Sequence, residues 1–444
     1  MNTEFNEQRD SLYALIKSHD EQNVLVGAMI AKGDPALCQD LIEHAHQLIE
    51  ADWERAVIIN MMRVANEIPA IKEKLENRYK DLIENLRYSY SSQTEVELKE
   101  LLNICGNWSH RFLNDAPSEW NPTEETKAVL ATVPIESLDM QDKAWPVFPK
   151  WLPYLQQLKS INLKNTLLKE VPSAIQELKN LVYLTLDDNY LTALPASIGQ
   201  LTQLRVLSVQ NNQLTTLPEE LGKLTQLEEV IFRANQLKAL PKSTINWQQL
   251  QTLDIADNQL AILPTWEKKL AKLKQVDLSS NHLSTLPEGL QQCPALSKLN
   301  LSNNRVVALP NWLQGLKQLK KIYLANNQLT VLPPNLFTLT QLSALYLHNN
   351  ALEELPDTWQ TLGQLTYLDL EENDVTILPP SMGQLGKLQR LRLSNTALQT
   401  LPNHILQLPL LRKVSFMNTP MAKTTGREFV RKKSELKELA ALLK

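Results

Sequence analysis

Several kinds of residue are scarce in this chain of 444 residues, and each scarcity argues against a class of protein. The three cysteines, Cys38, Cys105 and Cys293, are too few and too widely spaced for a disulfide framework. The 11 glycines form no phosphate-binding loop. There is no long apolar run for a membrane span, and the N-terminus lacks the features of a cleavable signal. The sequence therefore predicts a cytoplasmic protein without a membrane span, although a non-cleaved bacterial export signal would escape this test.

An excess of positive charge is also lacking. The formal net charge is -4, and residues 1–134 hold 23 acidic against 13 basic side chains. Nucleic-acid binding needs a strongly basic surface, so the charge predicts no nucleic-acid partner. The acidic first part fits solubility as well as steering of a partner, and solubility is the simpler interpretation.

Constellations of catalytic or metal-binding residues are missing as well. His44 and His46 lie near Cys38, but their spacing does not bring all three onto one helical face, so no zinc site is predicted. Cys105 and His110 could be imagined as a nucleophile and its base, but packing of the cysteine in a helical core is the favoured interpretation. The prediction is a protein that is not an enzyme and that holds no metal or cofactor.

What the sequence has in abundance is a repeat of 23 residues. Its form is L-x-x-L-x-L-x-x-N-x-L-x-x-L-P-x-x-L-x-x-L. Twelve windows follow one another without insertion or deletion and start at Leu158, Leu181, Leu204, Leu227, Leu250, Leu273, Leu296, Leu319, Leu342, Leu365, Leu388 and Leu411. A fixed period of this length predicts a solenoid, in which each repeat packs on its neighbours.

The chemistry of one window predicts its local structure. Leu299 and Leu301 alternate with polar residues, so they lie on one face of a short strand. Strands one repeat apart then run parallel, about 4.8 Å from each other. The inward carboxamide of Asn304 can satisfy backbone groups where the strand ends. After Pro310, apolar residues recur at every third position, which predicts a 3₁₀ turn on the outer side.

This pattern resembles the leucine-rich repeat family, in its 23-residue class with the motif L-P-x-x-I/L-x-x-L. That class occurs in bacterial, plant intracellular and Ras-suppressor-like proteins. The resemblance covers residues 158–421. It implies an α/β solenoid, shaped as a right-handed horseshoe with a parallel sheet on its concave face.

Departures from the pattern occur at both ends and on the outer side. A degenerate first repeat occupies residues 135–157. Threonine replaces the ladder asparagine at Thr166, Thr396 and Thr419, as expected of terminal repeats. The outer leucine column is broken at Thr244/Ile245 and at Glu267, which predicts local irregularity on the convex side.

The two ends of the chain are predicted to be helical. Apolar residues at helical spacing, as in Phe5–Ile16 and Leu37–Ile49, indicate an all-α N-terminal domain over residues 1–134. This domain is interpreted either as a cap on the first edge of the sheet or as a regulatory or effector module. Residues 422–444 predict a C-terminal capping helix, with Phe429 and Leu439 among its buried side chains.

A binding site is expected among the variable residues that project from the concave sheet. Tyrosine and arginine are enriched at binding hot spots, and three tyrosines converge in neighbouring repeats. The predicted partner-binding residues are Lys298, Lys321, Tyr323, Tyr346, His348, Tyr367, Asp369, Glu371, Arg390 and Arg392. The competing interpretation is that tyrosine simply favours strands, and that Asp369 with Arg392 and Glu371 with His348 form ordinary cross-strand pairs.

A second candidate patch combines Arg233 with Asp254, Asp257 and Asp277. Like charges on adjacent strands are unfavourable without a counter-ion, so this patch could meet a basic partner. Carboxylates at a solvated surface tolerate the same arrangement at little cost.

The sequence thus predicts a non-enzymatic scaffold that binds a protein or peptide on its concave face, with a monomer favoured. The alternative makes the helical N-terminal domain the regulatory or effector module, which the repeats target to a partner. Binding of a carbohydrate or small ligand is a weaker hypothesis, because no deep pocket is expected on the concave face.

Overall fold

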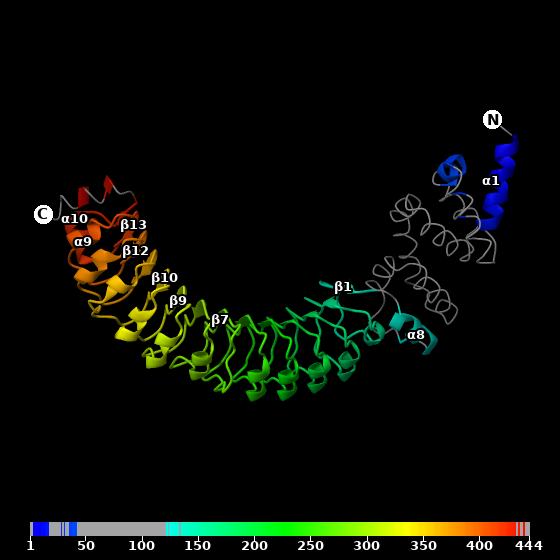
Figure 1. The fold of residues 1–444 in the computed structure, drawn as a ribbon, viewed down its shortest axis with the longest axis horizontal. Coiled ribbons are helices and arrows are strands. Elements are labelled where there is room, and N and C mark those ends of the chain that lie inside the picture. The colour runs from blue at the N-terminus through cyan, green and yellow to red at the C-terminus, as the bar shows by residue number, and fades with distance from the viewer. Residues whose placement is uncertain are drawn as a thin grey trace. The chain divides into compact units, whose positions relative to one another are not determined.

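The computed structural model describes residues 3–16, 28, 31, 35–41, 121–122, 124–132, 135–431, 434–435 and 438–439. The chain divides into two compact units (Figure 1). The first comprises Met1–Met140 and Val147–Ile161, and the second comprises Gln141–Pro146 and Asn162–Lys444.

The described elements of the first unit are short. They are α1 (Thr3–Ile16), α8 (Glu124–Thr132), β1 (Ser137–Asp139), η1 (Leu152–Tyr154) and the start of β2 (Ser160–Asn162). Helix α1 coincides with the predicted Phe5–Ile16 segment, and residues 35–41 are helical at the start of the predicted Leu37–Ile49 segment. The other predicted helices, together with His44, His46, Cys105 and His110, lie outside the described residues. The all-α domain over 1–134 and its boundary therefore stay predictions.

The second unit is a solenoid built on one sheet, in which β3 to β14 follow one another in chain order. The parallel strands are β3 (Tyr183–Thr185), β4 (Val206–Ser208), β5 (Glu229–Ile231), β6 (Thr252–Asp254), β7 (Gln275–Asp277), β8 (Lys298–Asn300), β9 (Lys321–Tyr323), β10 (Ala344–Tyr346), β11 (Tyr367–Asp369), β12 (Arg390–Arg392) and β13 (Lys413–Ser415). Partners in adjacent strands are one repeat apart, as Leu345 opposite Leu368. This register confirms the predicted parallel sheet.

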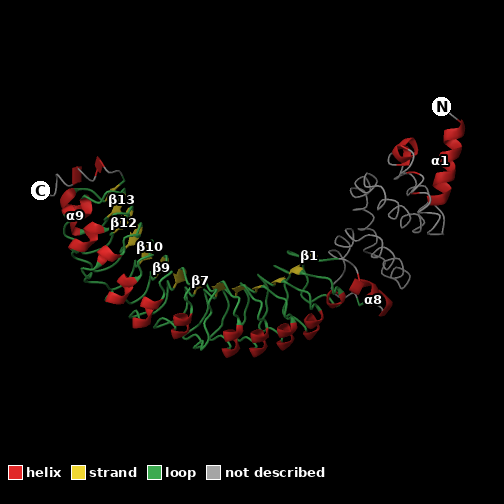
Figure 2. Ribbon diagram, viewed as in Figure 1, coloured by secondary structure: helices red, strands yellow, loops and turns green. Residues whose placement is uncertain are grey.

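Short helical turns return the chain on the outer side. They are η2 (Ser173–Glu177), η3 (Ala196–Gln200), η4 (Glu219–Lys223), η5 (Lys242–Asn246), η6 (Glu288–Gln292), η7 (Asn311–Gly315), η8 (Pro334–Thr338), η9 (Trp359–Thr361), η10 (Pro380–Gln384) and α9 (Asn403–Leu406). Figure 2 shows that the strands of this unit line the inner side of its curve and the turns its outer side. The leucine columns between them are buried, with Leu299 and Leu301 fully inaccessible.

The asparagine column replaces strand hydrogen bonds where each strand ends. Nδ2 of Asn281 donates to the carbonyls of Ile255, Leu278 and Ser279 at 3.0, 3.1 and 3.2 Å. Its Oδ1 accepts from the amide of Leu260 at 2.9 Å. The side chain is 4% exposed, and without it the Leu260 amide would be buried without a partner. The three carbonyls also accept from Asn258, from Asn304 and from the amide of Asp257. This confirms the role predicted for the column.

Threonine retains only part of this arrangement in the terminal repeats. Oγ1 of Thr396 donates to the carbonyl of Leu393 at 2.7 Å, and Oγ1 of Thr419 donates to that of Phe416 at the same distance. A single hydroxyl hydrogen cannot reach the three carbonyls that a carboxamide serves. The substitution therefore falls where fewer neighbouring repeats have to be joined.

The predicted irregularity on the convex side is also confirmed. Thr244 is buried, and its Oγ1 donates to the carbonyl of Pro241 at 2.7 Å. Within residues 135–431, the return between β6 and β7 has no helical turn. Trp266 packs there with 2% exposure, and its Nε1 donates to Oγ1 of Thr244 at 3.2 Å. The exposed Glu267 lies beside this tryptophan.

The described part of the C-terminal end is not a single helix, although residues 434–435 and 438–439 are helical as predicted. Helix α10 (Pro420–Thr425) ends at Gly426, whose φ of 66° reverses the chain. Strand β14 (Phe429–Val430) then pairs antiparallel with β13. Pairing with the open edge of β13 satisfies its backbone, which a helix could not do. Phe429 is consequently 45% exposed rather than buried, whereas Leu439 is buried as predicted.

Candidate functional site

Three tyrosine rings stack on the concave face of β9, β10 and β11. The ring centroids of Tyr323 and Tyr346 are 4.4 Å apart with 13° between the planes. Those of Tyr346 and Tyr367 are 4.7 Å apart at 32°. The register places Tyr346 directly opposite Tyr323, whereas Tyr367 reaches it diagonally, which aromatic side chains can do. The predicted convergence of the tyrosines is confirmed.

A buried carboxylate lies beside this tyrosine stack (Tyr323, Tyr346 and Tyr367). Asp369 is 1% exposed, and its Oδ2 accepts a hydrogen bond from Nη1 of Arg392 at 3.0 Å. Nδ1 of His348 lies 3.4 Å from the same oxygen. The hydroxyl of Tyr367 donates to it at 3.3 Å, and Oδ1 accepts from the amide of Glu371 at 3.2 Å. Asp369 therefore holds its neighbours in place and has no free face for a partner.

The charges of this network change the protonation of its members. Burial alone would raise the pKa of Asp369, but His348, the Glu371 amide and the Arg392 charge outweigh burial and hold it below its usual value. The same contact with Asp369 raises the pKa of His348, against the effect of its own burial. Burial also raises the pKa of Tyr323 and Tyr367, so both hydroxyls remain neutral donors.

The structure corrects one predicted pair and confirms another. Asp369 pairs with Arg392 as predicted, because the two are register partners on β11 and β12. Glu371 does not pair with His348. It forms an ion pair with Nη2 of Arg392 and accepts from Oγ of Ser415 at 2.8 Å. The guanidinium of Arg392 bridges the carboxylates of Asp369 and Glu371, and the imidazole of His348 contacts the buried carboxylate of Asp369.

The first residues of the three-residue strands form one column across the concave sheet, called here the first column. Basic side chains flank the tyrosine stack along it. Nζ of Lys298 lies 5.8 Å from the Tyr323 ring centroid, a cation–π distance. Lys321 and Arg390 are exposed in the same column. Lys413, opposite Arg390 on β13, extends the column but was not among the predicted site residues. Its position one repeat after Arg390 is the sequence signal that indicates it.

Most charged groups of the second candidate patch already have partners within the protein. Arg233 pairs with Asp257 at 2.5 Å. Asp254 and Asp277 are register partners, and burial together with Asp277 raises the pKa of Asp254. Nδ2 of Asn300 donates to Oδ2 of Asp277 at 2.9 Å. Asp254 and Asp277 thus lie on the adjacent strands β6 and β7, whereas Arg233 and Asp257 follow the ends of β5 and β6 and engage each other.

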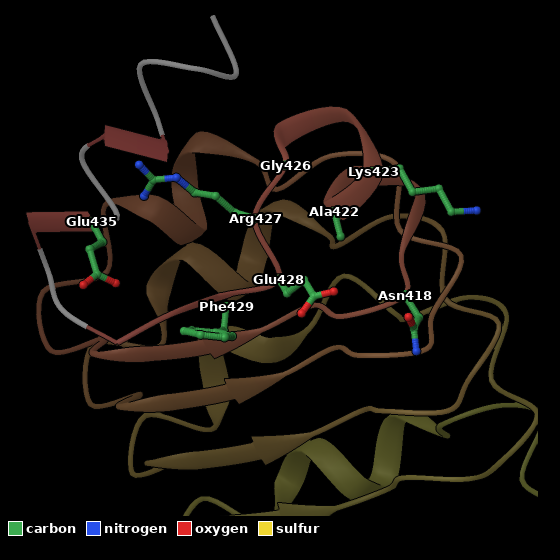
Figure 3. A pocket seen from close by; sticks show the side chains of 8 residues that line it. All are labelled: Asn418, Ala422, Lys423, Gly426, Arg427, Glu428, Phe429 and Glu435. Atoms are coloured by element: carbon green, nitrogen blue, oxygen red, sulfur yellow. The ribbon is translucent and has the colours of Figure 1, made fainter.

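A pocket of about 690 Å³ lies at the C-terminal end of the solenoid (Figure 3). Its lining is Asn418, Ala422, Lys423, Gly426, Arg427, Glu428, Phe429 and Glu435. Arg427 is held by Glu438 at 2.8 Å, and Glu435 accepts from the amide of Arg431 at 2.8 Å. Arg427 and Glu435, two of the charged residues that line the pocket, are therefore already engaged by other groups of the protein.

No group of three or more histidine, cysteine or acidic side chains is arranged for a metal ion within the described part of the chain. None of its helices has both the length and the hydropathy of a membrane span.

Comparison with known proteins places the chain in a family. A model described as leucine-rich repeat region matches residues 148–234, and one described as leucine rich repeat matches 225–283, 248–306 and 317–375. No curated protein matches the sequence.

Solved structures agree with these matches. A leucine-rich repeat protein of Leptospira interrogans is 33% identical over 67% of this chain and 76% of its own, with a TM-score of 0.63. The plant peptide hormone receptor RGFR1, solved in complex with RGF2, is 27% identical over 66% and 49%, with a TM-score of 0.58. An internalin of Listeria monocytogenes, 20% identical over 66% and 83%, shares the fold with a TM-score of 0.57. The chain belongs to the leucine-rich repeat family.

Proposed function

We propose that this protein is a non-enzymatic interaction scaffold that binds a protein or peptide on the concave face of strands β8 to β13. The observation that carries the proposal is the tyrosine stack, whose half-buried rings lie among exposed basic side chains. Among similar structures, the receptor RGFR1 was solved in complex with RGF2, which supports a role in recognition for this chain as well.

The physics of the stack favours binding. A tyrosine offers a large amphipathic contact area and has few rotatable bonds to immobilise. Each ring here already packs against a neighbour, so the tyrosine side chains would lose little further conformational entropy when a partner binds. Asp369 and Arg392 fix the edge of the stack through Tyr367. Such a preorganised aromatic centre with arginine nearby has the composition of a hot spot.

A peptide selection tests the proposal. Phage-displayed peptides are selected on the full chain, and their affinities are measured for Tyr323→Ala/Tyr346→Ala and for the control Gln314→Ala/Gln360→Ala, which lies on the outer turns η7 and η9. We expect the concave variant to lose about tenfold or more in affinity, as for hot-spot residues, and the control to bind like the wild type. Equal affinities of the two variants would refute the site.

The alternative assigns the function to the predicted helical domain over 1–134. Selected peptides that bind the full chain but respond to neither variant favour that alternative. The cytoplasmic location and the monomeric state also stay predictions.

A further inference from the structure

The first column of the concave sheet has an unusual order of side chains over β8 to β13. In register it reads Lys298, Lys321, Ala344, Tyr367, Arg390 and Lys413. Two pairs of basic residues on neighbouring strands are thus separated by one small and one aromatic residue. Lys321, Arg390 and Lys413 are exposed, and Lys298 is half-buried against the Tyr323 ring.

These basic pairs lack acidic partners within the protein. In residues 135–431, the ion pairs of strands β10 to β12 are made by His348 and Arg392 with Asp369 and Glu371. Within that range, none of the four basic column residues forms one. Like charges directly opposite each other in a sheet are destabilising, so both pairs cost stability in the free protein. A partner that brings carboxylates to them would relieve this repulsion.

We propose that this basic column (Lys298, Lys321, Arg390 and Lys413) binds an extended acidic segment of a partner protein, with two pairs of carboxylates. The midpoints of the two basic pairs are four strand steps apart, which is about 19 Å at a strand spacing of about 4.8 Å. An extended chain advances about 3.3 Å per residue and covers this distance in about six residues. Side chains of an extended chain alternate between its two faces, so the carboxylates of each pair must lie two residues apart. The segment therefore has the form Glu-x-Glu-x-x-x-Glu-x-Glu, with Asp equally suitable.

The stack geometry favours a peptide over single-stranded nucleic acid. Nucleobases bind such proteins by stacking on open aromatic faces. Both faces of Tyr346 are covered by its neighbours, and Lys298 lies over Tyr323. The central ring thus presents its edge and hydroxyl group, on which the three middle residues of a peptide can pack and form hydrogen bonds.

The proposal rests on the proposed function and is tested with defined probes on the full chain. Fluorescence anisotropy measures binding of labelled Glu-Thr-Glu-Val-Thr-Val-Glu-Thr-Glu. The comparison probes are its counterpart with glutamine in place of each glutamate, the isomer Thr-Val-Thr-Glu-Glu-Glu-Glu-Val-Thr, and a ten-nucleotide oligothymidylate. The variants are Lys321→Glu/Arg390→Glu, its neutral counterpart Lys321→Gln/Arg390→Gln, and the outer-face control Lys223→Glu/Lys317→Glu, which has the same net charge as the first. Circular dichroism shows whether each variant folds.

We expect the spaced acidic peptide to bind about tenfold more tightly than the glutamine peptide and the isomer. The charge reversal should weaken it by about tenfold and the neutral variant by less, whereas the outer-face control leaves it unchanged. Added salt should weaken binding, since exposed charges are screened.

Equal binding of the isomer, or an equal loss in the outer-face control, would overturn the proposal in favour of unspecific attraction. Tighter binding of oligothymidylate would overturn it in favour of nucleic acid. The broader function fails separately: selected peptides that depend on Tyr323 and Tyr346 but lack acidic pairs leave the scaffold proposal intact and contradict this one.

Discussion

Nη1 of Arg392 lies 3.0 Å from Oδ2 of Asp369, a carboxylate that is 1% exposed on the concave face. The two residues are register partners, so the guanidinium lies over the carboxylate and also reaches Glu371. A buried carboxylate needs such partners, because its desolvation is costly. The surface around the tyrosine stack is therefore supported by a connected network rather than by independent charges.

Removal of Arg392 should expose this dependence. Arg392→Met leaves Asp369 buried without its cation, and we expect a loss of about 2 kcal/mol in the free energy of unfolding, less than for a fully buried pair because Arg392 is 45% exposed. Asp369→Asn/Arg392→Met should lose less, since neither partner is then left charged and alone. Urea denaturation followed by circular dichroism measures both, and an additive double variant would contradict the network.

His348 should make stability depend on pH. Its contact with Asp369 raises its pKa, against its burial and the charge of Arg392, while Glu372 adds to the increase. A folded-state pKa above the unfolded value of about 6.5 gives stability that is complete below that pH. It is lost as the pH rises through the folded pKa. Relative to His348→Gln, the wild type should lose up to about 1 kcal/mol on passing to higher pH. Urea midpoints across this range test the sign, and a rise contradicts it.

Tyr346 is the central ring of the stack and should matter most for its order. Tyr346→Ala removes two ring contacts, each worth about 0.5–1.5 kcal/mol, whereas Tyr346→Phe keeps both. We expect the alanine variant to lose about 1–2 kcal/mol in stability and most of the affinity for concave-face peptides. The phenylalanine variant should be close to the wild type in stability. Thermal unfolding and peptide titration separate the two effects, and equal losses in both variants would count against stacking.

A ladder asparagine should be costly to remove at the centre of the array. Asn281→Ala leaves the buried amide of Leu260 without its acceptor and removes one of two donors from three carbonyls, so we expect a loss of about 2 kcal/mol or more. Asn281→Thr should retain part of this energy, as the terminal repeats do. Gln259→Ala is an exposed control that should remain within about 0.5 kcal/mol of the wild type. Chemical denaturation ranks the three, and an unchanged alanine variant would contradict the assigned role.

Two glycines of the outer turns should respond in opposite ways to alanine. A Cβ on Gly289 would lie 2.6 Å from the carbonyl oxygen of Pro264 and 3.0 Å from Cε3 of Trp266, whereas one on Gly315 meets nothing within 4 Å. Gly289→Ala should therefore cost about 1–3 kcal/mol through overpacking. Gly315→Ala should be neutral or stabilising by up to about 1 kcal/mol. Melting temperatures provide the comparison, and an inverted order would disprove the packing of Trp266.

The repeat made most of the second unit predictable. Packing requires leucine at Leu299 and Leu301, and hydrogen bonding requires Asn304, so these residues carry the architecture in their spacing. The C-terminal strand was not predictable in this way. The periodicity of residues 422–444 indicates a helix, but the unpaired edge of β13 selects a strand at Phe429–Val430, and that demand is tertiary.

The candidate site was predictable in its columns but not in its contacts. Register alone brings Tyr323 to Tyr346 and Asp369 to Arg392. Which carboxylate His348 selects depends on how the long Arg392 side chain bridges two acids, and spacing does not encode that choice. The particular 23-residue class and the boundaries of the domains likewise remain predictions.

Photo-crosslinking tests the central claim most directly. A benzophenone amino acid replaces Tyr346 in one variant and the exposed Gln314 of the outer turn η7 in another, and each is irradiated with a selected peptide on the full chain. Mass spectrometry then identifies the covalent adduct. Recognition on the concave face predicts a crosslink from position 346 and none from position 314. A crosslink from position 314 alone would contradict the account.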